Sequence, residues 1–143
     1  MNAVLAANLI VSRVLPLPYF EQSQELIRIR KQEGAELFSP VLWSYVVVSV
    51  LRKANSLQIL SAEQLNAALG LIWDLGIQPV LPTPDLHRLL LEWAERLKRS
   101  KACDSAYLGA AESLHVEFWT ADQRLAAAAR QLGAEWVHVV GNS

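Results

Sequence analysis

Five short apolar segments, separated by stretches with helical character, constrain the fold of this chain more than any other feature of its sequence. Each segment has the length and composition of a strand that is buried on both faces. The strands are expected at Ala3–Ala7, Ala35–Phe38, Ile77–Leu81, Val116–Trp119 and Trp136–Val140. Strands that alternate with helices form a parallel sheet joined by right-handed crossovers. The sequence therefore predicts an α/β protein with three layers (α/β/α) and a central five-stranded parallel sheet.

Start and stop signals delimit the helices between these strands. A cap residue and a proline, Ser39-Pro40, predict that a helix opens there, and Ser61 with Gln64 resembles a capping box. The helix that starts at Pro40 is apolar nearly all round, so we expect it to be buried. Helices are expected at Tyr19–Glu33, Pro40–Ala54, Ser61–Leu75, Thr83–Arg99 and Cys103–Leu114, and between Asp122 and Gly133.

Length and composition indicate one domain over residues 1–143 with an ordinary hydrophobic core. Of the residues, 52% are hydrophobic and the net charge is −1, so any nucleic-acid or membrane binding would need a local patch. The single cysteine, Cys103, excludes an internal disulfide framework and is expected to be a small buried hydrophobe. The histidines lie far apart in the sequence, without the spacing of metal ligands.

The apolar N-terminal stretch does not have the features of a targeting segment. It lacks a basic start, and Arg13 interrupts its apolar run. The apolar run Pro40–Leu51 is shorter than the roughly 20 residues that a membrane helix needs. These features predict a cytoplasmic protein that does not associate with membranes.

Two acidic residues in the last third of the chain are the main candidates for chemistry. No GxGxxG, GxxxxGK or GxSxG motif occurs, which weighs against nucleotide-binding and serine-hydrolase functions. Asp104 opens a helical segment, and Asp122 follows the fourth expected strand. An aspartate at a helix start commonly caps the backbone N–H groups, so capping or surface solvation is the simplest interpretation of each.

The segment Lys101–Leu125 resembles the C-terminal half of PIN domains, including VapC-type toxins. That family places an acid in a "DAAYLALAE" context, then a strand, then "TADxRL"; the matching residues here run from Asp104 to Glu112 and from Thr120 to Leu125. Val4–Asn8 resembles the "LDAN" opening strand of the family, and Tyr45–Lys53 resembles its "YEVxSVLRK" helix. The resemblance spans nearly the whole chain, and the C-terminal motifs are its most specific part.

Active members of that family are ribonucleases in which four acids hold one or two Mg²⁺ or Mn²⁺ ions, and the metal generates a hydroxide. The resemblance assigns the third and fourth acids to Asp104 and Asp122, and an orienting hydroxyl to Thr120. The first two acids are missing, because Ala6 and Val46 occupy their places. We therefore expect metal binding at Asp104 and Asp122 to be weak or absent.

Three functions follow from this assignment. The first is a degenerate PIN domain that has a binding or assembly role and has lost most or all nuclease activity. The second is a working Mg²⁺- or Mn²⁺-dependent ribonuclease, such as the toxin of a toxin–antitoxin pair, with a third acid elsewhere. Glu36 and Glu112 are poor candidates for that acid by their sequence positions. The third is an unrelated α/β interaction module.

The resemblance also implies partners. PIN domains commonly form homodimers, and their toxin members bind a short antitoxin. Trp93 and Leu90, at helical spacing, are predicted to belong to an apolar dimer surface, whereas most of the five tryptophans are expected in the core or an interface. Weak RNA binding would use basic side chains, which otherwise belong to solvated helix ends. These are Arg52, Lys53 and Lys101, with Lys98 and Arg99 close by in sequence.

Overall fold

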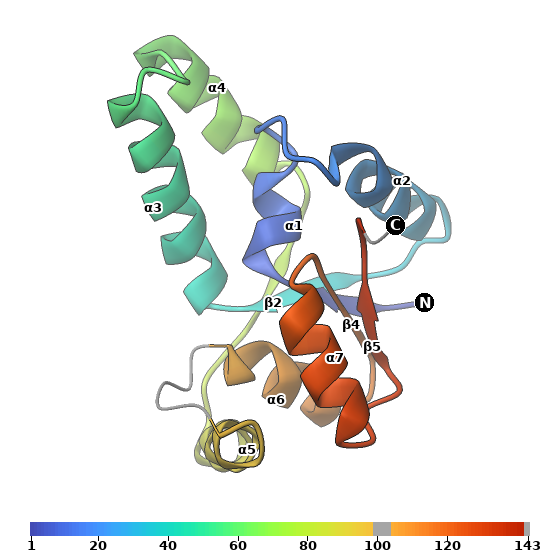
Figure 1. Cartoon of the computed structure of the whole chain (residues 1–143). Coiled ribbons are helices and arrows are strands. Elements are labelled where there is room, and N and C mark those ends of the chain that lie inside the picture. Colours follow the sequence, from blue (N-terminus) through green and yellow to red (C-terminus); the bar gives the residue numbers. More distant parts are fainter. Residues whose placement is uncertain (99–103, 142–143) are drawn as a thin grey trace.

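The computed structural model describes residues 1–98 and 104–141, and its centre is a five-stranded sheet (Figure 1). All of its strand pairs are parallel. The strands are β1 (Ala3–Leu5), β2 (Leu37–Pro40), β3 (Gln78–Val80), β4 (Glu117–Thr120) and β5 (Val137–Val139). This confirms the predicted α/β class with a five-stranded parallel sheet.

The order of the strands in the sheet is β3-β2-β1-β4-β5. The chain first builds outward from β1 through β2 to β3, and then returns to the other side of β1 with β4 and β5. The strand order therefore reverses next to β1, between β1 and β4. In open α/β sheets, sites lie outside the carboxyl ends of the strands at such a reversal.

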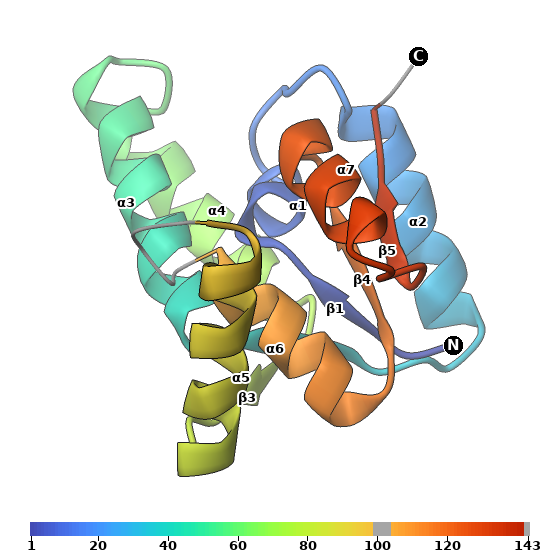
Figure 2. The same ribbon diagram turned by 60° about the horizontal axis from the view of Figure 1, so that its bottom comes forward.

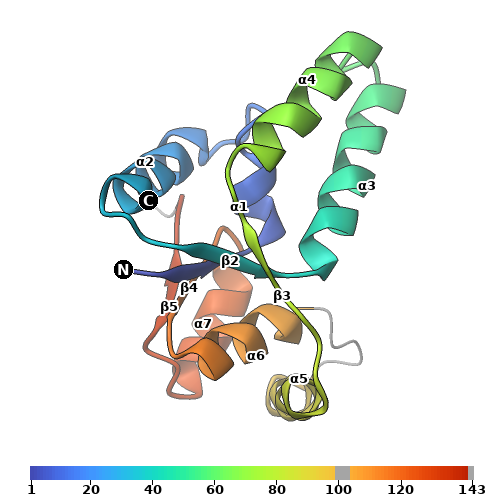
Figure 3. The same ribbon diagram turned by 180° about the vertical axis from the view of Figure 1, so that it is seen from behind.

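Helices cover both faces of the sheet, which confirms the three layers (Figures 1 and 3). One layer holds the first four helices, and the other holds the last three. In chain order they are α1 (Ala7–Val11), α2 (Phe20–Gln32), α3 (Leu42–Ser56), α4 (Ala62–Trp73), α5 (Pro84–Arg96), α6 (Ser105–Leu114) and α7 (Gln123–Gln131). The helices α3 and α4 form a hairpin that extends away from the sheet (Figure 3).

Local capping chemistry explains several helix starts. Ser61 and Gln64 form the predicted capping box at α4, and the Thr83 hydroxyl accepts the Leu86 N–H at α5. The prediction that Ser39-Pro40 opens a helix is wrong, because both residues belong to β2. The Ser39 hydroxyl is buried and donates to the carbonyl of Leu5, and Pro40 lies opposite Val80 of β3.

The first helix, α1, was not expected from the sequence, which predicts a strand up to Ala7. The strand ends at Leu5, and the helix begins at Ala7 without a side-chain cap at Ala6. Its residues are almost all apolar and buried, including Leu9 and Ile10. The one polar residue between Ala3 and Val11 is Asn8, which lies inside the helix, so nothing at Ala6 marks where the strand ends and the helix begins.

The prediction that the start of α3 is buried all round is wrong. Trp43, Val47 and Leu51 pack in the core, but Tyr45 is 73% exposed and Val48 is 52% exposed. The prediction that Trp93 contributes to a surface is also wrong, because Trp93 is buried and packs edge-on against Trp136. Trp73, in contrast, is largely exposed. Thus apolar residues of this chain form both a core and an open face.

Within the parts that the structure describes, no helix is long and apolar enough to cross a membrane. The same segments share one hydrophobic core that is built around β1 and β4. The Phe118 ring in β4 stacks on the Tyr107 ring of α6, with 5.6 Å between centroids. This contact joins the central sheet to the helix that follows Asp104. Cys103 lies outside the described residues, so its expected burial has no structural counterpart.

Candidate functional site

A small pocket lies at the carboxyl ends of β1 and β4, where the strand order reverses. We call it the strand-end pocket; its volume is about 200 Å³. Its lining comes from several elements, because β1 and β4 end beside each other and α1, α3, α6 and α7 begin there (Figure 2). The lining residues are Ala6, Ala7, Asn8, Leu42, Val46, Asp104, Tyr107, Thr120, Asp122 and Leu125. The structure thus brings together all five positions that the sequence assigned to one site.

The two acids of the strand-end pocket have different local roles. The Asp122 carboxylate caps α7, since its Oδ1 atom accepts the Leu125 N–H at 3.0 Å. Asp104 occupies the corresponding position before α6, but its side chain makes no capping hydrogen bond. Both residues are partly exposed. Helix capping therefore accounts for Asp122 and does not account for Asp104.

A hydrogen-bond network around Thr120 fixes the floor of the strand-end pocket. The buried Thr120 hydroxyl oxygen accepts from the Asn8 side-chain amide at 3.3 Å and from the Asp122 backbone N–H at 3.1 Å. The Asn8 amide oxygen in turn accepts the Ala121 N–H at 3.2 Å. The Asn8 side chain therefore ties the end of β1 to the turn between β4 and α7.

Sequence reasoning did not single out Asn8 and Tyr107 as site residues. The Tyr107 hydroxyl accepts the Ala7 backbone N–H at 3.3 Å, and the Tyr19 hydroxyl donates to the Asn8 carbonyl at 3.1 Å. Burial raises the pKa of Tyr19. The sequence offers one signal for them: Asn8 and Tyr107 belong to the segments Val4–Asn8 and Asp104–Glu112, which resemble family motifs. Asn8 and Tyr107 therefore position the backbone just after the carboxyl end of β1.

The donor set of the strand-end pocket does not fit a divalent metal ion. A hydroxyl oxygen has two acceptor lone pairs, and both are used at Thr120. One oxygen each of Asp122 and Asn8 also accepts a backbone N–H. The side chains of Ala6 and Val46 contribute only apolar carbons to the lining. In the described segments no group of three or more histidine, cysteine or acidic residues could hold a metal ion.

Replacing Thr120 with valine tests the network directly. The substitution keeps the shape but leaves the Asn8 amide and the Asp122 N–H without their acceptor. Each unsatisfied donor costs about 1–3 kcal/mol when it is buried, and partial hydration lowers this, so we expect about 2 kcal/mol less free energy of unfolding. Urea denaturation measures the change. Thr120→Ser keeps the oxygen and should lose only about 1 kcal/mol, the value of one buried methyl group. Equal stability of the two variants would contradict the network.

Of the remaining predicted site residues, those that the structure describes do not line the strand-end pocket. Arg52 and Lys53 are exposed near the C-terminal end of α3, about two turns beyond Val46, and Arg52 donates to Asn55. Lys101 and Arg99 lie outside the described residues. Glu36 lies before β2 at the opposite edge of the sheet, where its N–H bonds to Asn2. Glu36 is therefore no substitute for a missing acid of the pocket.

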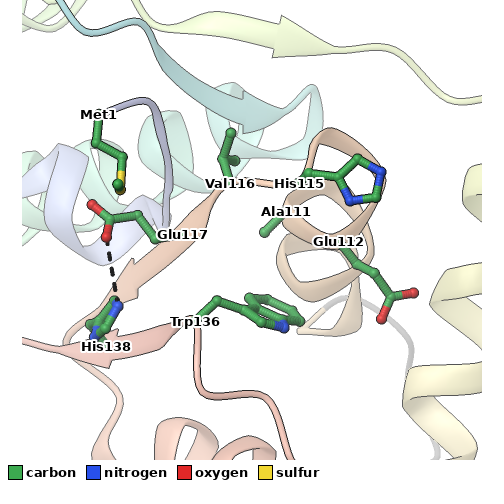
Figure 4. Close-up of a pocket in the computed structure, with 8 residues that line it drawn as sticks. All are labelled: Met1, Ala111, Glu112, His115, Val116, Glu117, Trp136 and His138. Atoms are coloured by element: carbon green, nitrogen blue, oxygen red, sulfur yellow. Dashed lines mark ion pairs between the residues drawn. The ribbon is translucent and has the colours of Figure 1, made fainter.

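Glu112 belongs to a separate and larger pocket at the amino ends of β1, β4 and β5, which we call the amino-edge pocket (Figure 4). Its volume is about 480 Å³. The Glu112 and His115 side chains point away from Glu117 and His138, which form an ion pair at 3.6 Å (Figure 4). Burial lowers the pKa of His138, although Glu117 acts in the opposite direction. The four side chains do not converge on one point.

Comparison with known proteins leaves the site to be interpreted from its geometry. No protein-family model matches this sequence. No curated protein matches it significantly either. The functional conclusion therefore depends on the fold, on the strand-end pocket and on the motifs in the sequence.

Proposed function

We propose that this chain is a degenerate PIN-like domain with a binding or assembly role, in which metal-dependent nuclease activity is lost or strongly weakened. One observation carries the proposal. Ala6, Val46, Asp104, Thr120 and Asp122, which the family-like motifs assign to one site, all line the strand-end pocket. Motifs that are far apart in the chain thus converge where α/β proteins of this type have their sites. Such convergence supports the motif assignment.

The chemistry of the pocket supports the loss of nuclease activity. Hard divalent ions take oxygen ligands, and a nuclease site surrounds them with carboxylates from separate elements. Here two of the four positions are hydrocarbon, and one oxygen of Asp122 already caps α7. Two further carboxylates without a cation would repel each other and be costly to desolvate. Alanine and valine remove that cost together with the metal site.

The alternative is an Mg²⁺- or Mn²⁺-dependent ribonuclease, including the toxin of a toxin–antitoxin pair. One observation favours it: the Asp104 side chain lines the pocket without capping α6. Capping therefore gives no reason for an acid at this position. An active enzyme would need a further oxygen ligand from a partner or from the RNA itself.

The open apolar face supports an assembly role, and we propose that a second copy of the chain covers it. A groove of about 360 Å³ runs between the start of α3 and α5. Figure 3 shows these two helices on opposite sides of the sheet, at the side where β3 lies. We call it the α3–α5 groove. It is lined by Pro40, Val41, Leu42, Val80, Pro82, Leu86, His87, Leu90 and Ala106. Tyr45, one turn beyond Val41, and Leu91, one turn beyond His87, extend the apolar surface.

Contiguous apolar surface of this kind marks an interaction site in soluble proteins. A homodimer would bury Tyr45 and Leu91 without burying a charged side chain of α3. This helix carries no acidic residue, and its two cations lie farther along it. The proposal also includes an antitoxin-like partner protein and weak RNA contacts through Arg52 and Lys53. Both are exposed and lie beyond the apolar part of α3.

An RNA cleavage assay tests the loss of activity. Single-stranded RNA with a fluorophore and a quencher is incubated with the protein and millimolar Mn²⁺, and we expect no cleavage above that of Asp104→Asn. Asp104 is the suitable position because its replacement removes no helix cap. Cleavage that requires Mn²⁺, occurs with the wild type and disappears in Asp104→Asn would support the ribonuclease instead.

A further inference from the structure

A second groove, remote from the strand-end pocket, gathers three cationic side chains over an apolar floor. It lies between α2 and the C-terminal end of α4, beside the end of α1 (Figure 3), and its volume is about 390 Å³. We call it the α2–α4 groove. Arg13, Arg28 and Lys31 are its cations, and Ile27 and Leu75 are buried beneath them. This size lies in the range of small-ligand sites.

Helical spacing explains how the cations reach one side. Gln24, Arg28 and Lys31 stand at positions i, i+4 and i+7 of α2, so they share one face of the helix. Arg13 comes from the turn after α1, and Asp74 comes from the end of α4. Three separate segments therefore contribute polar side chains to the groove.

A chain of hydrogen bonds leads from a buried serine pair to the first cation. The Ser12 and Ser23 hydroxyls are fully buried and lie 2.7 Å apart. The Gln24 amide donates to Ser12 Oγ, and its oxygen accepts from the Arg13 guanidinium, both at 3.4 Å. The guanidinium is thereby oriented through one of its five N–H groups, and the others stay available to a ligand.

The third cation is anchored from the opposite wall. Lys31 Nζ donates to the carbonyl of Leu75, just beyond α4, which uses one of its three donors. In the described parts of the chain neither Arg13 nor Lys31 forms an ion pair, whereas Arg28 pairs with Glu25. Among the described residues that line the groove, Asp74 is the one acid. The groove therefore has an excess of positive charge.

We propose that the α2–α4 groove binds a phosphate monoester attached to a small ring body, of the nucleoside monophosphate class. The phosphate would accept hydrogen bonds from Arg13, Arg28 and Lys31, since charge-assisted bonds to oxyanions are the stronger ones. The ring would cover Ile27 and Leu75, and Asp74 would accept a hydroxyl or amino hydrogen. The ligand is either a free nucleotide or the phosphorylated end of a nucleic-acid strand. This site uses no residue of the strand-end pocket and does not depend on the proposed loss of nuclease activity.

Titration with adenosine 5′-monophosphate, followed by calorimetry and by amide chemical shifts, tests the proposal. Adenosine lacks the phosphate, and inorganic phosphate lacks the ring. Each should bind at least about fivefold more weakly than adenosine 5′-monophosphate. Arg13→Gln and Arg28→Gln should each weaken binding about fivefold. Asp74→Asn should strengthen it, because the substitution removes a negative charge that repels the phosphate and keeps an amide oxygen that can still accept a hydrogen bond. Arg88→Gln is the matched control and should leave the affinity unchanged, because Arg88 is an exposed cation of α5, in the opposite layer, and pairs with Asp85 as Arg28 pairs with Glu25.

The two arginine variants are the most informative ones, because Arg13 and Arg28 do not hold α4 in place. Lys31→Gln removes a contact to the end of α4 and would also affect stability, so the two arginine variants carry the result. Saturable binding that weakens in both of them and strengthens in Asp74→Asn supports the site. Absence of saturable binding, or equal affinity in Arg13→Gln and the wild type, overturns it. A 5′-phosphorylated dinucleotide that binds more tightly than the mononucleotide would identify a strand end as the source of the phosphate.

Discussion

The double variant Ala6→Asp with Val46→Glu is expected to bind Mn²⁺ at least about 100-fold more tightly than the wild type. Loss of a residue that merely orients a ligand typically costs about 10–100-fold in affinity, and two direct ligands should count for more. The two new carboxylates would join Asp104 and Asp122 around the same pocket. Hard divalent ions prefer such an oxygen-rich set.

The double variant should also show a characteristic coupling between metal and stability. Ala6 is only 4% exposed, so an aspartate there is costly without a cation. We therefore expect a lower melting temperature than that of the wild type without metal, and recovery with Mn²⁺. Saturation to about 100 times the dissociation constant adds about 2.7 kcal/mol to the free energy of unfolding.

Ala6→Asn with Val46→Gln is the matched control, because the new side chains have the same size without the charge. Its melting temperature should not change when Mn²⁺ is added. If the metal-free double variant does not fold, Val46→Glu alone at its partly exposed position gives the comparison. A folded double variant whose melting temperature does not respond to Mn²⁺ would mean that the first two acid positions are misassigned.

Glutamate at both Tyr45 and Leu91 is expected to dissociate the proposed homodimer. The two side chains are 73% and 65% exposed in the single chain and flank the α3–α5 groove. Burial of a large apolar side chain contributes about 1.5–3 kcal/mol, so losing two should raise the dissociation constant at least about 100-fold. Because both positions are open in one copy, the monomer should keep its fold. Sedimentation velocity over a wide range of concentration measures the change.

Leu57→Glu is the control for this experiment. Leu57 is 61% exposed, but it lies in the turn between α3 and α4, away from the groove. The same charge at this position should leave the dimer intact. A wild type that sediments as a monomer at every concentration would exclude a second copy as the partner of the face, and so would a double variant that stays dimeric.

The sheet could be predicted from the sequence because its signal is local. Each strand is a short apolar run bounded by helix signals, and all five were found within one or two residues of their observed ends. The secondary-structure predictions fail where contacts between distant parts of the chain decide which element a residue joins. Pro40 extends β2 because Val80 lies beside it, although proline after serine is equally typical of a helix start.

Burial and site geometry could be predicted only in part. Strand order and the carboxyl-end rule bring the motif positions together, but the contact of Ala7 with Tyr107 joins residues 100 positions apart. No local pattern indicates such a pair. Likewise, the apolar character of α3 is the same at Val47, in the core, and at Tyr45, on the surface. Only packing distinguishes a core face from an interaction face.

Calorimetric titration of the wild-type chain with Mn²⁺ is the most direct measurement of the central claim, which concerns the number of carboxylates in the strand-end pocket. With two acids, and one oxygen of Asp122 engaged in capping, we expect no saturable heat up to millimolar Mn²⁺. Saturable binding at micromolar Mn²⁺ that disappears in Asp104→Asn would contradict the claim and favour a working metal-dependent ribonuclease.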